Sequence, residues 1–221
     1  MSVPLQTQPG TPDRAWYIVG RWSEFEGEGR ANLMRIIGIL AFYAVEQANY
    51  RGLKLGLLAI PKIEPVDRPF HLAMTALAAA WVLAALGVHI CLRVQIFPTS
   101  LKYVSTGIDL LLMTCVLALA NSVQSPLIVG YFLIVAMAGL RFNLPLLWYA
   151  TIGGMLSYLV LPGQSRWFSP GDLRVPRYHQ VIFLLALGLT GATIGQILRR
   201  VRSMAVEYAG RLEAEMKRGL R

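Results

Sequence analysis

A long uncharged run near the C-terminal end limits what this chain can fold into. Residues 182–198 carry no charged side chain. With their flanks, over 181–201, they reach the roughly 20 apolar residues that a helix needs to cross about 30 Å of hydrocarbon. The whole chain is 55% hydrophobic and only 15% charged, whereas a soluble domain carries about 25% charged residues. The sequence therefore predicts an all-α, polytopic membrane protein.

Five further apolar segments precede this run, so we expect a bundle of about six transmembrane helices. The expected spans are 31–50, 70–92, 101–121, 126–141, 144–162 and a sixth that starts near Tyr178. Between the first two, the apolar stretch Leu53–Ile60 is too short to cross. We divide the chain into an N-terminal polar and interfacial segment (1–30), a six-helix transmembrane domain (31–201) and a C-terminal amphipathic helix (202–221) that extends into the cytoplasm.

The basic residues lie mostly near the ends of the expected spans. We therefore interpret the net charge of +9 as a topology signal and a contact with anionic lipids, and expect no nucleic-acid partner. If both termini are cytoplasmic, 13 basic residues face the cytoplasm and 7 face outward. The cytoplasmic set is Arg14, Arg21, Arg30, Arg93, Lys102, Arg141, Arg199, Arg200, Arg202, Arg211, Lys217, Arg218 and Arg221, and the outer set is Arg51, Lys54, Lys62, Arg68, Arg166, Arg174 and Arg177. This bias favours an integral protein of the bacterial inner (plasma) membrane with both termini inside.

Three charged residues fall near the cytoplasmic level of the spans: Arg35, Asp109 and Arg141. A charge in the bilayer costs several kcal/mol and generally has a partner or a task. An ion pair between Arg35 and Asp109 would lower the cost of both. It would either fix the register of the helices or act as a switch that alters the sixth helix.

A second polar group is expected at the outer end, where Glu46, His71 and His179 fall at one level. Such residues could hold a Zn²⁺-like ion, sense protons or a ligand, or simply face headgroups and water. Because no HxxxH or HxxE spacing supports a ligand set, we expect no tight metal site. We also expect no cofactor beyond bound lipid.

The last span carries a stripe of small residues, Gly188, Gly191 and Gly195, of the kind that lets membrane helices approach closely. Apolar residues then continue at alternating steps of four and three, the spacing of a two-helix seam: Ile194, Leu198, Val201, Ala205, Tyr208 and Leu212. Two interpretations stay open. The stripe and seam contact a second copy or a partner subunit, or they pack within the bundle and end in an amphipathic surface tail.

This arrangement resembles the membrane anchor of bacterial class III adenylyl cyclases, and residues 191–195 and 198–202 carry the resemblance. It covers residues 30–221 as architecture only, and implies a six-helix module that dimerises and continues its last helix into a transducing coiled coil. The sequence to Arg221 contains no cyclase domain, so no catalytic residue is carried over.

No phosphate-binding loop, dinucleotide fingerprint, nucleophile elbow or HExxH motif occurs in the sequence. We therefore expect a non-enzymatic membrane scaffold, anchor or receptor-like module that contacts a second copy or a partner subunit through its last helix. Two alternatives stay open: an accessory subunit of a large respiratory or photosynthetic complex, or a small transporter or channel that uses Glu46 and Asp109.

The distribution of basic residues predicts that Ser2 and Ser203 both face the cytoplasm. Single cysteines at these positions should react with a membrane-impermeant reagent only after the cells are opened. Labelling of either position from outside in intact cells would overturn the topology.

Overall fold

The computed structural model describes residues 12–51, 54–55, 58–59, 68–94, 98, 100–120, 125–168 and 176–219. The elements follow in the order α1 (Pro12–Arg51), β1 (Lys54–Leu55), β2 (Leu58–Ala59), α2 (Arg68–Arg93), α3 (Leu101–Leu119), the 3₁₀-helix η2 (Pro126–Val129), α4 (Gly130–Gly139), α5 (Leu144–Phe168) and α6 (Arg177–Gly219). The two short strands pair antiparallel, with Leu55 opposite Leu58. Within the described residues the fold is otherwise helical, as expected.

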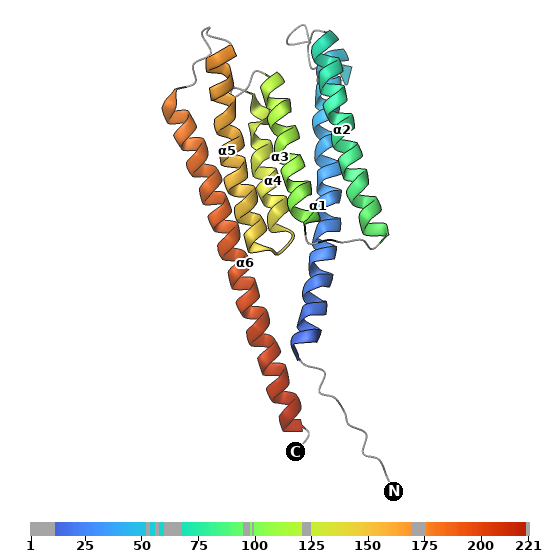
Figure 1. Cartoon of the computed structure of the whole chain (residues 1–221), viewed down its shortest axis with the longest axis vertical. Coiled ribbons are helices and arrows are strands. Elements are labelled where there is room, and N and C mark those ends of the chain that lie inside the picture. The colour runs from blue at the N-terminus through green and yellow to red at the C-terminus, as the bar shows by residue number, and fades with distance from the viewer. Residues whose placement is uncertain are drawn as a thin grey trace.

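The helices run up and down, and α1 and α2 form one side of the bundle while α6 lies at the other (Figure 1). The first turns of α1 and the last turns of α6 project beyond the same end of the bundle (Figure 1). We call this end the projecting end. Helices α3, α4 and α5 lie between these two sides, and α1 packs against α2 and also touches α4.

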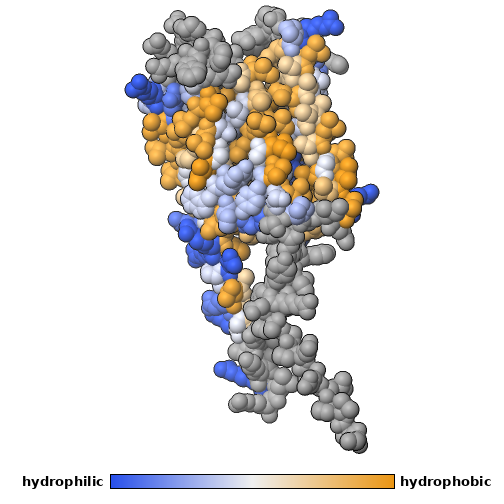
Figure 2. Space-filling model, viewed as in Figure 1, coloured by the Kyte–Doolittle hydropathy of each residue, from blue (hydrophilic) through white to orange (hydrophobic). Residues whose placement is uncertain are grey.

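Four helices of the described part are long and apolar enough to cross a membrane: α2, α3, Leu144–Gly163 of α5, and Arg177–Arg211 of α6. This is the pattern expected of an integral membrane protein. Figure 2 shows mostly apolar side chains over the body of the bundle, hydrophilic ones toward its ends, and both kinds on the projecting part of α6.

Within the described residues, the other two expected spans do not form helices that are both long and apolar enough to cross a membrane. The segment Pro126–Gly139, which joins η2 and α4, is apolar but shorter than a membrane-crossing helix. The span expected at 31–50 is helical, but Asn32, Arg35 and Glu46 interrupt its apolar character. Helix α1 also begins at Pro12, so the backbone continues without a break through the boundary expected at residue 30.

The core lies between α3, α4, α5 and α6, where large side chains are fully enclosed. Tyr131, Leu147 and Leu187 are each 0% exposed. The Tyr131 hydroxyl lies 2.9 Å from that of Thr114, and the ring of Phe183 lies 4.2 Å from that of Tyr158. This core holds α6 against the rest of the bundle as far as Leu198, which is partly buried against it.

The glycine stripe of α6 faces α5 of the same chain. A Cβ atom at Gly188 would lie 2.9 Å from Cε of Met155, and one at Gly195 would lie 3.4 Å from Cδ1 of Leu144. A Cβ atom at Gly191 would collide with the side chain of Thr151. The close helix contact expected here is therefore present, but it lies inside the bundle. Of the two interpretations left open by the sequence, packing within the bundle describes these glycines in the single chain, because α5 covers them.

We predict that Gly191→Leu destabilises the bundle by about 1–3 kcal/mol, because a large side chain must displace Thr151 and force α5 and α6 apart. The control is Gly210→Leu in the same helix, where an added Cβ meets nothing within 4 Å. Thermal unfolding of the detergent-solubilised protein measures both. Equal transition temperatures for the two variants would contradict the packing described here.

Candidate functional site

Arg35 of α1 and Asp109 of α3 form a buried ion pair near the projecting end. The guanidinium lies 2.7 Å from the carboxylate through Nη2 and Oδ2, and Nε donates to Oδ1 at 2.8 Å. The two side chains are 2% and 3% exposed. The ion pair expected from the sequence is thus confirmed, in the two-pronged geometry that makes arginine–carboxylate contacts strong. Its action as a switch stays a prediction.

Neighbouring side chains complete the bonds of this pair. Nε1 of Trp81 in α2 donates to Oδ1 of Asp109 at 2.8 Å. Nη1 of Arg35 donates to Oδ1 of Asn32 at 2.6 Å, and the amide of Asn32 donates to the carbonyl of Ala85 in α2 at 3.1 Å. One hydrogen-bonded group therefore joins α1, α2 and α3.

Arg141 forms a second buried ion pair, with a residue that the sequence analysis had not singled out. Its Nη2 lies 2.8 Å from Oε1 of Glu28 in α1, and the side chains are 3% and 0% exposed. Arg141 also donates to the carbonyl of Lys102 at 3.0 Å, to Ser105 at 3.1 Å and to Thr106. Arg141 had been grouped with Arg35 and Asp109, but its direct partner is Glu28.

Arg141 lies in the turn between α4 and α5, outside both helices. Burial lowers the pKa of its guanidinium, while the Glu28 carboxylate acts in the opposite direction. One buried atom on each side, Oε2 of Glu28 and Nε of Arg141, has no hydrogen-bond partner. This pair is therefore less completely satisfied than the pair of Arg35 and Asp109.

Only two of the three polar residues expected together at the outer end, Glu46 and His71, are in contact. Nδ1 of His71 lies 2.8 Å from Oε1 of Glu46, and Tyr50 stacks on the His71 ring at 3.9 Å. His179 instead packs beside Tyr178, with ring centres 4.2 Å apart. Within the described ranges, no three His, Cys, Asp or Glu residues are grouped so as to hold a metal ion. The idea of Glu46, His71 and His179 as one ligand set is therefore wrong, because only the first two meet, across α1 and α2.

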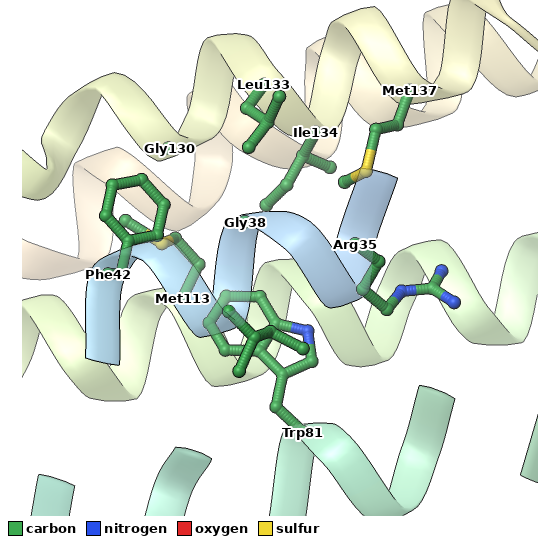
Figure 3. Close-up of a pocket in the computed structure, with 10 residues that line it drawn as sticks. Arg35, Gly38, Phe42, Trp81, Met113, Gly130, Leu133, Ile134 and Met137 are labelled. Atoms are coloured by element: carbon green, nitrogen blue, oxygen red, sulfur yellow. The ribbon is translucent and has the colours of Figure 1, made fainter. Parts of the chain in front are cut away.

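A small apolar cavity lies between α1 and α4, bounded also by Trp81 of α2 and Met113 of α3 (Figure 3). Its volume of about 20 Å³ is room for about one water molecule, whereas ligand pockets usually exceed about 300 Å³. Arg35 borders the cavity, but its guanidinium points away from it (Figure 3). The cavity is thus a packing gap beside the ion pair.

The apolar seam on α6 is partly buried within the bundle and exposed beyond its projecting end. Ile194 and Leu198 are partly buried against the core. Beyond them Val201 is 40% and Tyr208 66% exposed, and Ala205 is also exposed. The side chain of Leu212 lies outside the described residues. The same stripe therefore packs inside the bundle and then continues uncovered along the projecting helix.

No protein-family model, curated protein or solved structure matches this chain. The arrangement of its own side chains therefore carries the functional argument.

We predict that Asp109→Asn destabilises the protein by about 3–5 kcal/mol, because it leaves Arg35 buried without a counter-charge. Combining Arg35→Leu with Asp109→Leu should cost less than the sum of the two single changes, because the double change leaves no lone charge. Chemical or thermal unfolding in detergent measures all four variants: Asp109→Asn, the two single leucine changes and their combination. Strict additivity would contradict a coupled pair.

Proposed function

We propose that this chain is a non-enzymatic integral membrane scaffold, anchor or receptor-like module. In this proposal the projecting part of α6 binds a second copy of the chain or a partner subunit. The bundle holds that helix at the membrane surface and sets the direction in which it leaves.

The observation that carries the proposal is the uncovered apolar stripe on the projecting helix. Val201, Ala205 and Tyr208 continue the spacing of Ile194 and Leu198, which do have a packing surface. Met204, beside this stripe, is also 53% exposed. Apolar side chains on an aqueous helix favour burial against another surface, and alternating steps of four and three suit a second helix.

The charges at the junction support a location at the membrane interface. Arg199, Arg200 and Arg202 are exposed just where α6 leaves the bundle, as suits contact with anionic headgroups. The projecting end carries both the start of α1 and the end of α6 (Figure 1). We place this end in the cytoplasm because of the basic-residue bias, and the protein in a bacterial inner membrane.

The polar residues favour this proposal over a transport path. Asp109 binds Arg35 and Trp81 in a satisfied group, and Glu46 binds His71 across α1 and α2. The two carboxylates that a transporter would use are thus each engaged in holding helices together. An accessory subunit of a larger complex would bind other proteins, whereas a self-associating scaffold would bind a second copy of itself. Native mass determination of the gently solubilised protein distinguishes these two roles, because it reports which chains are bound.

We predict that single cysteines at Ala205 and Tyr208 form crosslinks to another chain in native membranes, in a background where Cys91 and Cys115 are alanine. A cysteine at Ser203 serves as the control, because it lies about 200° around the helix from Ala205. It should crosslink several-fold less.

Val201→Asp combined with Tyr208→Asp should abolish the crosslink at Ala205 while leaving membrane insertion intact, because both positions are exposed in the single chain. If no position crosslinks, or all three crosslink equally, the stripe is not a partner seam and the scaffold proposal fails.

A further inference from the structure

The turn between α4 and α5, residues 140–143, lies between the two helices that project from the bundle. On one side it meets α1, where a Cβ atom at Gly27 would lie 2.9 Å from the carbonyl oxygen of Leu140 and 3.0 Å from Cα of Arg141. These are backbone contacts, which cannot rotate aside as a flexible side chain can. Gly27 therefore lets α1 sit directly on the backbone of the turn.

The next residue of α1 fixes this docking chemically. Glu28 accepts hydrogen bonds from Arg141 at 2.8 Å and from Ser105 at 3.3 Å. The carboxylate is fully enclosed. Moving α1 off the turn would separate a buried carboxylate from a buried guanidinium, a change that is strongly unfavourable unless both reach water.

On its other side the turn is bracketed by contacts with α6. A Cβ atom at Gly139, the last residue of α4, would lie 2.7 Å from Cγ2 of Ile194. At the start of α5, Leu144 packs against Gly195. These α6 positions lie within one turn of Leu198, after which the helix is exposed. The contacts therefore hold α6 at the point where it leaves the bundle.

Hydrogen bonds hold the turn in one local conformation. The backbone N–H groups of Leu140, Arg141 and Phe142 all donate to carbonyls in the last turn of α4. Phe142 adopts the left-handed region with φ of 49°. The side chain of Asn143 accepts the N–H of Leu146 at the start of α5. Local hydrogen bonds thus tie the turn to both flanking helices.

We propose that this turn couples the projecting part of α1 to that of α6. When Gly27 and Glu28 are seated on the turn, it holds Ile194 and Gly195 in one position, and the projecting helix leaves the bundle in one direction. When a partner or ligand pulls the start of α1 away, the turn shifts and α6 changes direction. This inference rests on the proposed function, since it supplies the regulation of the partner-binding helix.

The test measures the direction of α6 within one chain. Spin labels at Leu111, an exposed position on α3, and at Val206 on the projecting helix report its position relative to the bundle. Cys91 and Cys115 are replaced by alanine, and each nanodisc holds one chain, so that no second copy contributes. Two changes disturb the docking in different ways. Gly27→Ala pushes against the turn backbone, and Glu28→Gln removes the charge that Arg141 faces.

Each change has a matched control. Gly29→Ala adds the same methyl group to the same helix, at a position where a Cβ atom meets nothing within 4 Å. Glu46→Gln neutralises a partly buried carboxylate of the same helix, which pairs with His71 away from the turn. Interface shifts of about 1–2 Å are typical of coupled helices. We expect the distance between the labels to shift or broaden by about 2 Å or more in Gly27→Ala and Glu28→Gln, and to stay at the parent distribution in both controls.

Unchanged distributions in folded Gly27→Ala and Glu28→Gln protein would overturn the coupling, as would equal changes in the controls. Should Gly27→Ala not fold, Glu28→Gln decides alone, because it adds no atom to the contact. Crosslinking between chains is measured separately. If the cysteines at Ala205 and Tyr208 form no crosslink to another chain, but the distance between the two labels still changes in Gly27→Ala and Glu28→Gln, only the proposed function is wrong. If the crosslink forms but the distance between the labels stays unchanged in both variants, only the coupling is wrong.

Discussion

The high cost of an unpaired charge in an apolar bundle governs this structure. Arg35, Asp109, Glu28 and Arg141 are all nearly or fully buried, and each faces an opposite charge. Both pairs join α1 to elements distant in sequence, α3 in one case and the turn after α4 in the other. A buried pair is weak evidence for net stability, but removal of one member leaves an uncompensated buried charge. Displacing α1 would therefore break two buried charge pairs as well as the apolar contacts of Ala31 and Ile39 with the core.

The pattern along α1 follows from this constraint. Glu28, Asn32 and Arg35 lie four and three residues apart, on one face of the helix, and this face points into the bundle. Leu33 and Ile37, on other faces, are 56% and 51% exposed. A soluble helix would place its apolar stripe inward, but in a membrane the lipid takes the apolar face and charges turn inward. Rotation of α1 by one residue, about 100°, would withdraw all three polar residues together.

The sequence could predict the first pair but not the second. Arg35 and Asp109 stand out because each is charged within an apolar run at the same depth. Glu28 does not stand out, because it belongs to an acidic run before the first apolar residues and falls in the segment 1–30 that the sequence places outside the bundle. Its spacing from Asn32 and Arg35 was the available signal.

The glycine stripe likewise predicted a close contact, but not which helix supplies it. That helix is α5, where Leu147, Thr151 and Met155 recur every four residues. The order of six helices was predictable too. In the described part of the chain, however, four of them are long and apolar enough to cross a membrane, because polar residues interrupt α1 and α4 is short.

The projecting part of α6 raises a separate physical question, namely what keeps it helical. An isolated helix of this length is marginal in water, chiefly because its first turn is costly to form. Here that turn already exists, because the helix grows out of a segment packed against α5 and the core. Propagation therefore needs no partner, and the exposed pair of Glu207 and Arg211 adds the modest support of neighbours four residues apart. What the projecting helix lacks is cover for Val201, Met204, Val206 and Tyr208. In the proposed function, this uncovered apolar surface, and not a need for helical order, is the reason for a second helix as partner. In the proposed coupling, the direction in which the bundle releases the helix then decides whether the two can meet.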